Sequence, residues 1–97
     1  MYEVKNHPLV EEDLKELDHS FRILVFKKLK KLQSAPELGE ALGNKNNLDL
    51  SGMYKVYVAK KKVRIVYEIF NKELIIYIIT IGKRDEMEVY IKASQRR

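Results

Sequence analysis

The chain has 97 residues, a net charge of +5 at neutral pH and no cysteine. This length suits one domain with a single hydrophobic core, and the lack of cysteine excludes a disulfide framework, a thiolate metal site and a thiol nucleophile. No stretch approaches the roughly 20 apolar residues of a membrane span, and the first residues lack the apolar core of a signal peptide. We therefore expect a single cytoplasmic domain, residues 1–97, that does not contact a membrane.

Residues 2–5 are expected to form a short strand, either at a sheet edge or paired with a later strand. Two helices follow, and the connection between them is short enough to predict an antiparallel helical hairpin. Pro8 suits the first turn of the first helix, and Ser20 is a good N-cap for the second. Their apolar stripes are Val10, Leu14 and Leu17 in the first helix, and Phe21, Val25, Leu29 and Leu32 in the second.

Four lysines crowd the other side and the C-terminal end of the second helix: Lys27, Lys28, Lys30 and Lys31. Such a run is more often a solvated helix face that suits the helix dipole, and nucleic-acid contact is the alternative. Residues 36–47 are interpreted as a Gly- and Asn-rich connection in which one helical turn, at 37–42, is the only regular structure expected.

Three runs rich in β-branched and aromatic residues predict strands at 53–59, 63–70 and 74–81. Lys60 and Lys61 are the predicted first hairpin turn; the second turn offers Asn71, which tolerates positive φ. The last run is apolar at nearly every position, which predicts a strand covered on both faces. The helical hairpin would cover one face and the C-terminal tail part of the other.

The tail is predicted to form a short helix that ends near Ala93. Asp85 and Glu88 have the spacing of a capping box. Met87, Tyr90 and Ile91 would form one side of this helix, and residues 95–97 are expected to be frayed. The predicted fold is therefore α+β, β-α-α-β-β-β-α, a small twisted and mainly antiparallel sheet with the helical hairpin on one face and the short C-terminal helix.

The pairing register of the first hairpin decides which polar side chains meet. Pairing the apolar sets of the two strands, with a two-residue turn, sets Val58 against Val63. The same register sets Tyr57 opposite Arg64, with Lys55 diagonal to it, on a face that the core does not use. A three-residue turn would separate these three residues.

The charge distribution points to a polyanion. Residues 1–45 hold eight basic and eight acidic side chains, whereas residues 46–97 hold eleven and six. A basic half-domain favours nucleic acid as a partner, and a soluble protein that is merely basic is the alternative. The sequence has no nucleophile elbow, Gly-rich phosphate loop or metal-ligand spacing, so no metal or cofactor is expected. His7 and His19 could form a ribonuclease pair, but a role at the helix boundaries is favoured.

The remaining candidates for chemistry are cations and phenols: Lys55, Tyr57, Arg64, Lys83, Arg84 and Tyr90. Such a group can bind RNA through phosphate contacts and base stacking, and can stabilise the negative charge of a pentacoordinate phosphorus. The alternatives are a solvated strand face for the lysines and an ion pair with Glu68 for the arginine of the second strand.

Three segments of this region, L-x-G-x-Y-K from residue 50, V-R-x-V-Y from residue 63 and G-K-R-x-x-x-x-V-Y from residue 82, resemble the RelE/ParE toxin superfamily on its RelE side. The resemblance covers nearly the whole chain in element order. It implies the toxin of a type II toxin–antitoxin pair, a ribosome-dependent endonuclease that cuts mRNA in the ribosomal A site and inhibits translation. The 2′-OH would attack the adjacent phosphate, leaving a 2′,3′-cyclic phosphate and a 5′-OH.

The resemblance also implies roles for single residues. Lys55 would help to activate the 2′-OH and Arg64 would stabilise the transition state. Arg84 would assist the leaving oxygen, and Tyr90 would stack on or orient a base. The residues expected to bind RNA around them are Tyr57, Lys60, Lys61, Lys62 and Lys83.

The chain departs from the family pattern at Tyr57, where the best-known members carry a second lysine. A lysine acts as a base only when its pKa is lowered, which clustered cations can do. The loss of one cation weakens that mechanism unless Lys60, Lys61 or Lys62 folds back toward the site.

The partners implied are a cognate antitoxin protein, whose acidic amphipathic segment would wrap the domain, and mRNA on the ribosome with contacts to 16S rRNA. Oligomerisation is expected through the antitoxin. Two alternatives stay open: a ParE-like inhibitor of DNA gyrase, and a catalytically weak member that only binds antitoxin or RNA.

Overall fold

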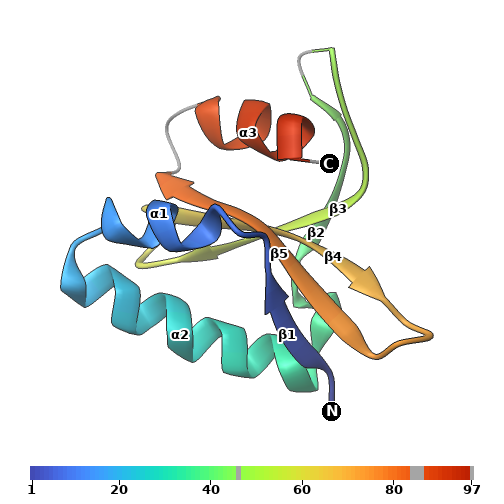
Figure 1. Ribbon diagram of the computed structural model, residues 1–97, viewed down its shortest axis with the longest axis horizontal. Coiled ribbons are helices and arrows are strands. Elements are labelled where there is room, and N and C mark those ends of the chain that lie inside the picture. The colour runs from blue at the N-terminus through green and yellow to red at the C-terminus, as the bar shows by residue number, and fades with distance from the viewer. Residues whose placement is uncertain (46, 84–86, 97) are drawn as a thin grey trace.

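The computed structural model describes residues 1–45, 47–83 and 87–96, which form a five-stranded sheet with helices on both faces (Figure 1). The sheet order is β1-β5-β4-β3-β2, with β1 parallel to β5 and every other neighbouring pair antiparallel. The elements are β1 (Glu3–Asn6), α1 (Val10–Lys15), α2 (His19–Ser34), a 3-10 turn η1 (Pro36–Leu38), β2 (Glu40–Lys45), β3 (Leu48–Val58), β4 (Val63–Phe70), β5 (Ile75–Lys83) and α3 (Glu88–Arg96). The predicted α+β class, with an N-terminal helical hairpin and a C-terminal helix, is confirmed.

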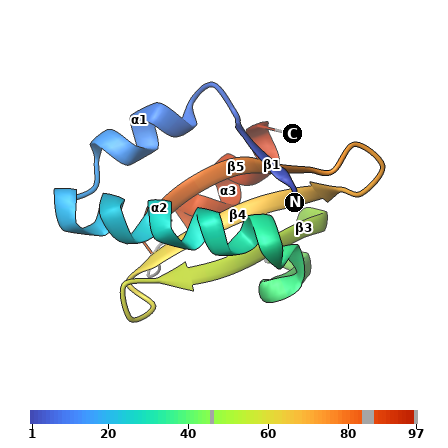
Figure 2. The same ribbon diagram turned by 90° about the horizontal axis from the view of Figure 1, so that it is seen from below.

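Two hydrophobic cores lie on opposite faces of the sheet. In Figure 2, α2 lies in front of the sheet and α3 behind it. Val25 and Leu32 of α2, together with Val10, pack on one face, while Val89 and Ala93 of α3 pack on the other. The prediction that the last hairpin strand is covered on both faces is therefore correct. No helix among the described residues has the length and apolar character needed to cross a membrane.

The strand β2 replaces the connection expected at 36–47, and the helical turn lies earlier, in η1. The residues of β2 have no strand-like hydrophobic pattern, because this edge strand buries little. Leu42 is its one buried residue among those whose exposure is described. Gly43 has a φ of +64° and lies at a register shift against β3. Gly39 directly precedes this strand, at a position where there is no room for a Cβ. A Cβ there would overlap the Tyr67 hydroxyl and lie 2.6 Å from the Lys55 carbonyl oxygen.

The register of the β3–β4 hairpin is the one predicted: Val58 pairs with Val63 and Tyr57 pairs with Arg64. Residues 59–62 form the turn, in which Ala59, Lys60 and Lys61 have positive φ.

Three local expectations are wrong. In the β4–β5 turn, Leu74 rather than Asn71 has positive φ, and Asn71 instead accepts a hydrogen bond from the Tyr2 hydroxyl at 2.7 Å. The N-cap of α2 is the extended residue Asp18, so Ser20 lies inside the helix. The helix α3 runs through Arg96, and its buried side comprises Val89, Tyr90 and Ala93, whereas Met87 and Ile91 are exposed.

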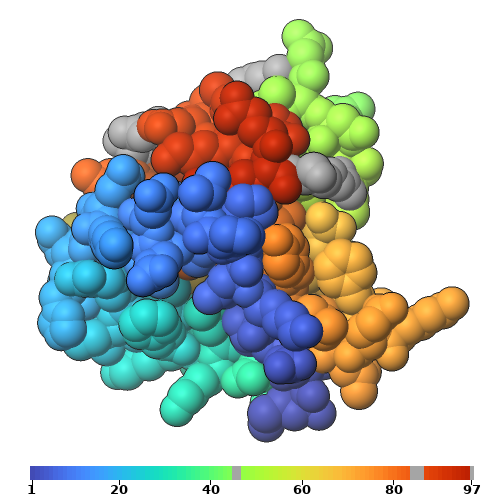
Figure 3. Space-filling view, viewed as in Figure 1, coloured from blue at the N-terminus to red at the C-terminus, as the bar shows by residue number. Residues whose placement is uncertain are grey.

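Arg96 is ordered because it forms a buried ion pair with Asp13. Its Nη1 lies 2.7 Å from Asp13 Oδ2 and its Nη2 lies 3.0 Å from Oδ1. Asp13 also accepts hydrogen bonds from the Thr80 hydroxyl and the Ile81 N–H, and Arg96 donates to the Ile79 carbonyl. Since β1 ends opposite Ile78, these side chains complete the backbone hydrogen bonds of β5 beyond its partner strand. The pair thereby fixes α3 beside α1, and the two helices lie side by side in the space-filling view (Figure 3).

Replacement of Asp13 by alanine should lower the free energy of unfolding by about 3 to 5 kcal/mol, because it leaves the Arg96 guanidinium buried without a counter-ion. Lys92→Ala, which breaks the exposed pair with Glu88, should cost only about 0.5 kcal/mol. Urea unfolding of both variants tests this. Equal losses would show that the Asp13–Arg96 pair does not anchor α3.

Candidate functional site

Four side chains form a cation–aromatic cluster on the α3 face of the sheet: Lys55 and Tyr57 of β3, Arg64 of β4 and Tyr90 of α3. The Lys55 Nζ donates a hydrogen bond to the Tyr57 hydroxyl at 3.0 Å and lies 5.0 Å from its ring centre. The Arg64 Cζ lies 5.5 Å from the Tyr57 ring centre and 4.4 Å from that of Tyr90. Of the six residues that the sequence grouped as candidates for chemistry, these four are therefore linked by successive contacts.

The close approach of α3 depends on Gly82. This residue pairs with Arg64 across β4 and β5, so both lie on the face that α3 covers. A Cβ at Gly82 would lie 2.5 Å from Cγ2 of Val89. Because glycine leaves this space free, Val89 reaches the sheet and the next residue, Tyr90, lies over Arg64.

The expectation that Arg64 occupies an exposed sheet face is wrong. It is 7% exposed, since Tyr90, itself 4% exposed, covers it, and its Nε is buried without a hydrogen-bond partner among the described residues. A guanidinium between two aromatic rings is stabilised by their negative faces. The charge of Arg64 is thereby held in place on one side of the cluster.

The hydrogen bond between Lys55 and Tyr57 shifts both pKa values. It lowers the pKa of the Tyr57 phenol to about 8, and the charges of Lys55 and Arg64 act in the same direction. It raises the pKa of Lys55, against a smaller lowering by burial. The Lys55 shift is opposite to the one expected from clustered cations, because the phenol stabilises the ammonium form. The most acidic proton donor of this pair is therefore a tyrosine.

A basic groove of about 470 Å³ lies between α2 and the β3–β4 turn, and Tyr57 is the residue that it shares with the cluster. Its apolar lining residues are Leu24, Val58 and Ala59. Its lysines are Lys27, Lys28, Lys31, Lys60 and Lys61. From the sequence, the α2 lysines and the lysines of the hairpin turn are separate features, because no local sequence pattern indicates that they line the same groove.

The turn places its three lysines differently. Lys61 comes nearest to the cluster, with its Nζ 6.0 Å from the Tyr57 ring centre. Lys60 lines the groove, and Lys62 is exposed in the same turn.

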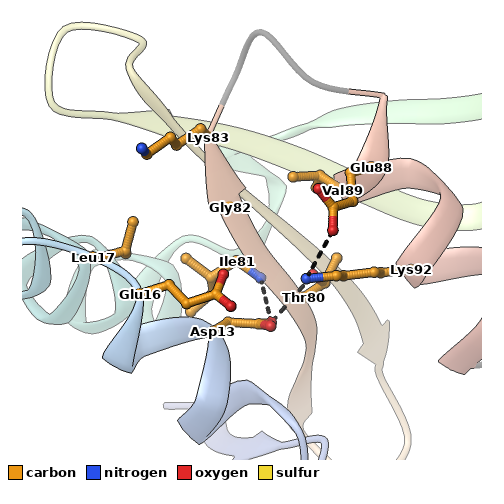
Figure 4. Close-up of a pocket in the computed structure, with 10 residues that line it drawn as sticks. All are labelled: Asp13, Glu16, Leu17, Thr80, Ile81, Gly82, Lys83, Glu88, Val89 and Lys92. Atoms are coloured by element: carbon orange, nitrogen blue, oxygen red, sulfur yellow. Dashed lines mark hydrogen bonds and ion pairs between the residues drawn. The ribbon is translucent and has the colours of Figure 1, made fainter.

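Lys83, another of the candidate residues, lies outside the cluster. Lys83 pairs with Val63, whose side chain belongs to the core under α2, so Lys83 lies on the opposite face from Arg64. It lines a second pocket, of about 150 Å³, which also contains the carboxylates of Asp13, Glu16 and Glu88 (Figure 4). Asp13 already accepts hydrogen bonds from β5. Arg84 and Asp85 of the predicted capping box lie outside the described residues.

The two histidines lie at helix boundaries, as favoured from the sequence. The Nδ1 of His7 accepts a hydrogen bond from the Leu9 N–H at 3.1 Å, just before α1, and His19 is the first residue of α2. Within the described part of the chain, no three carboxylate or imidazole groups gather in a way that could hold a metal ion.

Comparison with known proteins gives matches over nearly the whole chain. The family model described as the ParE toxin of the type II toxin–antitoxin system parDE matches residues 4–88. A putative RelE-like toxin protein of Escherichia coli is 30% identical over 95 residues, which cover 98% of this chain and 96% of that protein. The mRNA interferase toxin RelE of E. coli K12 is 33% identical over 43 residues, 44% of this chain and 45% of that toxin.

Two solved structures have the same fold. The isolated E. coli RelE toxin superposes with a TM-score of 0.71 and 22% identity, covering 99% of this chain and 98% of that one. The toxin of the intact E. coli RelBE toxin–antitoxin complex superposes with a TM-score of 0.70 and 19% identity, covering 86% and 96%.

Removal of the ammonium by Lys55→Met should raise the pKa of Tyr57 from about 8 toward the ordinary 10.0, because the hydrogen bond from Lys55 is the largest cause of the shift. The difference in phenolate absorbance between this variant and the same variant carrying Tyr57→Phe measures that pKa. Lys62→Met removes an equal charge from the exposed turn. If it raised the pKa as much, net charge and not the hydrogen bond would be responsible.

Proposed function

Because the chain belongs to the ParE/RelE family of type II toxin–antitoxin toxins, we propose that it is a ribosome-dependent endoribonuclease that cleaves mRNA in the A site. The observation that carries the proposal is the position of the Arg64 guanidinium, held between two aromatic rings beside the Lys55 ammonium. The relative named an mRNA interferase supports the same reaction.

In the proposed reaction, the 2′-OH of one nucleotide attacks the adjacent phosphate. Negative charge then increases on the phosphorus oxygens, and fixed cations stabilise it without having to reorganise. Arg64 and Lys55 are the two cations of the cluster that would do this. Their charges are already in position before RNA binds, since Tyr57 and Tyr90 hold them.

Tyr90 is proposed to act as a positioning residue. Its ring is buried against the guanidinium, which leaves this face unavailable to a nucleobase. The proposed role of Arg84 toward the leaving 5′ oxygen comes from the family resemblance alone.

The basic groove would bind the RNA that flanks the scissile phosphate. Its five lysines come from α2 and from the β3–β4 turn. Lysines contact phosphates without reading sequence, so they would fix the position of the strand. Similar contacts to ribosomal RNA would suit the same surface.

The proposed protein partner is an acidic antitoxin in the cytoplasm, which would also mediate oligomerisation. The similar toxin in the RelBE complex supports this class of partner. Exposed Ile23, Leu24 and Phe26 on α2, next to its lysines, would suit an acidic amphipathic segment.

A second candidate function, inhibition of DNA gyrase as in a ParE-like toxin, is favoured by one observation, the family model named after ParE. The retained cluster argues against it, because a protein that only binds gyrase needs no grouped cations for phosphate chemistry. The two functions differ in their targets, so one induction experiment separates them.

Arg64→Met should reduce mRNA cleavage on programmed ribosomes roughly 10²- to 10³-fold, because one fixed positive charge near the phosphate is removed. Primer extension on the translated mRNA measures cleavage. Lys72→Met, in the exposed β4–β5 turn at the other end of β4, should cleave as the wild type does. Intact mRNA with gyrase–DNA breaks in cells expressing the wild type would establish the second candidate instead.

The double substitution Lys28→Ala and Lys31→Ala should raise KM and reduce the salt dependence of RNA binding, by about 0.7 to 0.9 in the logarithmic slope for each phosphate that the protein no longer neutralises. Lys30→Ala is the matched control, because Lys30 is exposed on the same helix but does not line the groove. If Lys30→Ala, which removes one charge instead of two, had half the effect of the double substitution, only the net charge of α2 would matter.

A further inference from the structure

We propose that Tyr57 is the general base of this reaction, accepting the proton of the attacking 2′-OH on its phenolate oxygen. The inference rests on the proposed RNA cleavage and names the residue that starts it. It follows from the position of the Tyr57 oxygen, which accepts a hydrogen bond from the Lys55 Nζ at 3.0 Å, and of the Tyr57 ring, 5.5 Å from the Arg64 Cζ.

The other members of the cluster are poorly suited to take this proton. Lys55 is held in its ammonium form by the hydrogen bond that it donates, which raises its pKa. A guanidinium has no basic lone pair, which excludes Arg64. Tyr90 is 4% exposed and lies against Arg64. Tyr57 is only half-buried, which leaves it more accessible to RNA than Tyr90 or Arg64.

The two nearest charges, those of Lys55 and Arg64, favour the phenolate form of Tyr57. Lys55 faces it from its own strand and Arg64 from β4; Lys61 of the turn lies at 6.0 Å from its ring centre. The groove adds cations from α2 and the turn: Lys27, Lys28, Lys31 and Lys60. Glu40 of β2 pairs with Lys55 and is the acidic group of the described residues that acts on this lysine.

These charges place the phenol in the range useful for catalysis. A pKa of about 8 leaves roughly a tenth of the molecules ionised at pH 7, while the phenolate is still basic enough to accept a proton from an alcohol in the transition state. An ordinary tyrosine, with a pKa near 10, would be ionised in about one molecule in a thousand.

An O2′ lone pair forms the new bond to phosphorus while the 2′-OH proton moves to the Tyr57 oxygen. The bond between phosphorus and the 5′ oxygen breaks, and that oxygen keeps the bonding electrons and takes a proton from water. The neutral Tyr57 then returns its proton to the solvent. Lys55 and Arg64 remain charged throughout and offset the charge on the phosphate.

This assignment gives a role to the departure noted in the sequence. The position at which the best-known family members carry a second lysine holds, in this chain, an acid whose conjugate base is available near neutral pH. The remaining lysine changes its function accordingly, from a base to the cation that stabilises one.

The test is the pH dependence of single-turnover mRNA cleavage on programmed ribosomes. The wild-type rate should rise tenfold per pH unit below about pH 8 and level off above it. Tyr57→Phe should cleave roughly 10²- to 10⁴-fold more slowly and lose this dependence, while its affinity for the ribosome and its unfolding midpoint stay unchanged. A more acidic fluorotyrosine at position 57 should move the inflection to lower pH.

Tyr2→Phe is the control, since it removes a hydroxyl that bonds Asn71 at the far end of the sheet, and it should keep the wild-type profile. A Tyr57→Phe variant that cleaves with the wild-type rate and inflection would overturn the assignment of the base while leaving the proposed function intact. A wild-type protein that leaves programmed mRNA uncut would overturn the proposed function, and this inference with it.

Discussion

The buried ion pair between Asp13 and Arg96 is the interaction on which the functional face depends. It satisfies backbone groups of β5 that β1 does not reach, and it joins α1 to the last turn of α3. The same helix carries Val89 over Gly82 and Tyr90 over Arg64. The ion pair therefore anchors the same helix that carries an aromatic ring over a cation. Removal of a buried partner is costly, so this arrangement is fixed and not one of several equal packings.

The functional face concentrates positive charge, and aromatic groups offset the repulsion between its cations. Two cations of like charge share one small region, which by itself is unfavourable. The rings of Tyr57 and Tyr90 offer their negative faces to the guanidinium, and the Tyr57 hydroxyl accepts a hydrogen bond from the ammonium. The lowered pKa of Tyr57 is the direct result, because the nearby cations stabilise the phenolate that remains after the proton is lost.

Features that depend on a local sequence pattern could be predicted, whereas features that depend on tertiary contacts could not. Strand periodicity predicted that Tyr57 faces Arg64, because only one register buries both apolar sets. The burial of Arg64 could not be predicted, since it depends on how closely α3 approaches Gly82. The strand β2 has no alternating pattern, as edge strands need none. Arg96 looked like part of a frayed end because its partner lies 83 residues earlier in the chain.

That separation has a consequence for biosynthesis. A domain can fold on the ribosome only as far as its contacts have been translated. Here the hairpin that carries Lys55 and Arg64 is complete by residue 70, yet the ring that covers Arg64 and the arginine that anchors its helix come from residues 90 and 96. A nascent chain shorter than this lacks the assembled face. The ribosome that makes the protein is thus not exposed to its finished form until synthesis has passed residue 96.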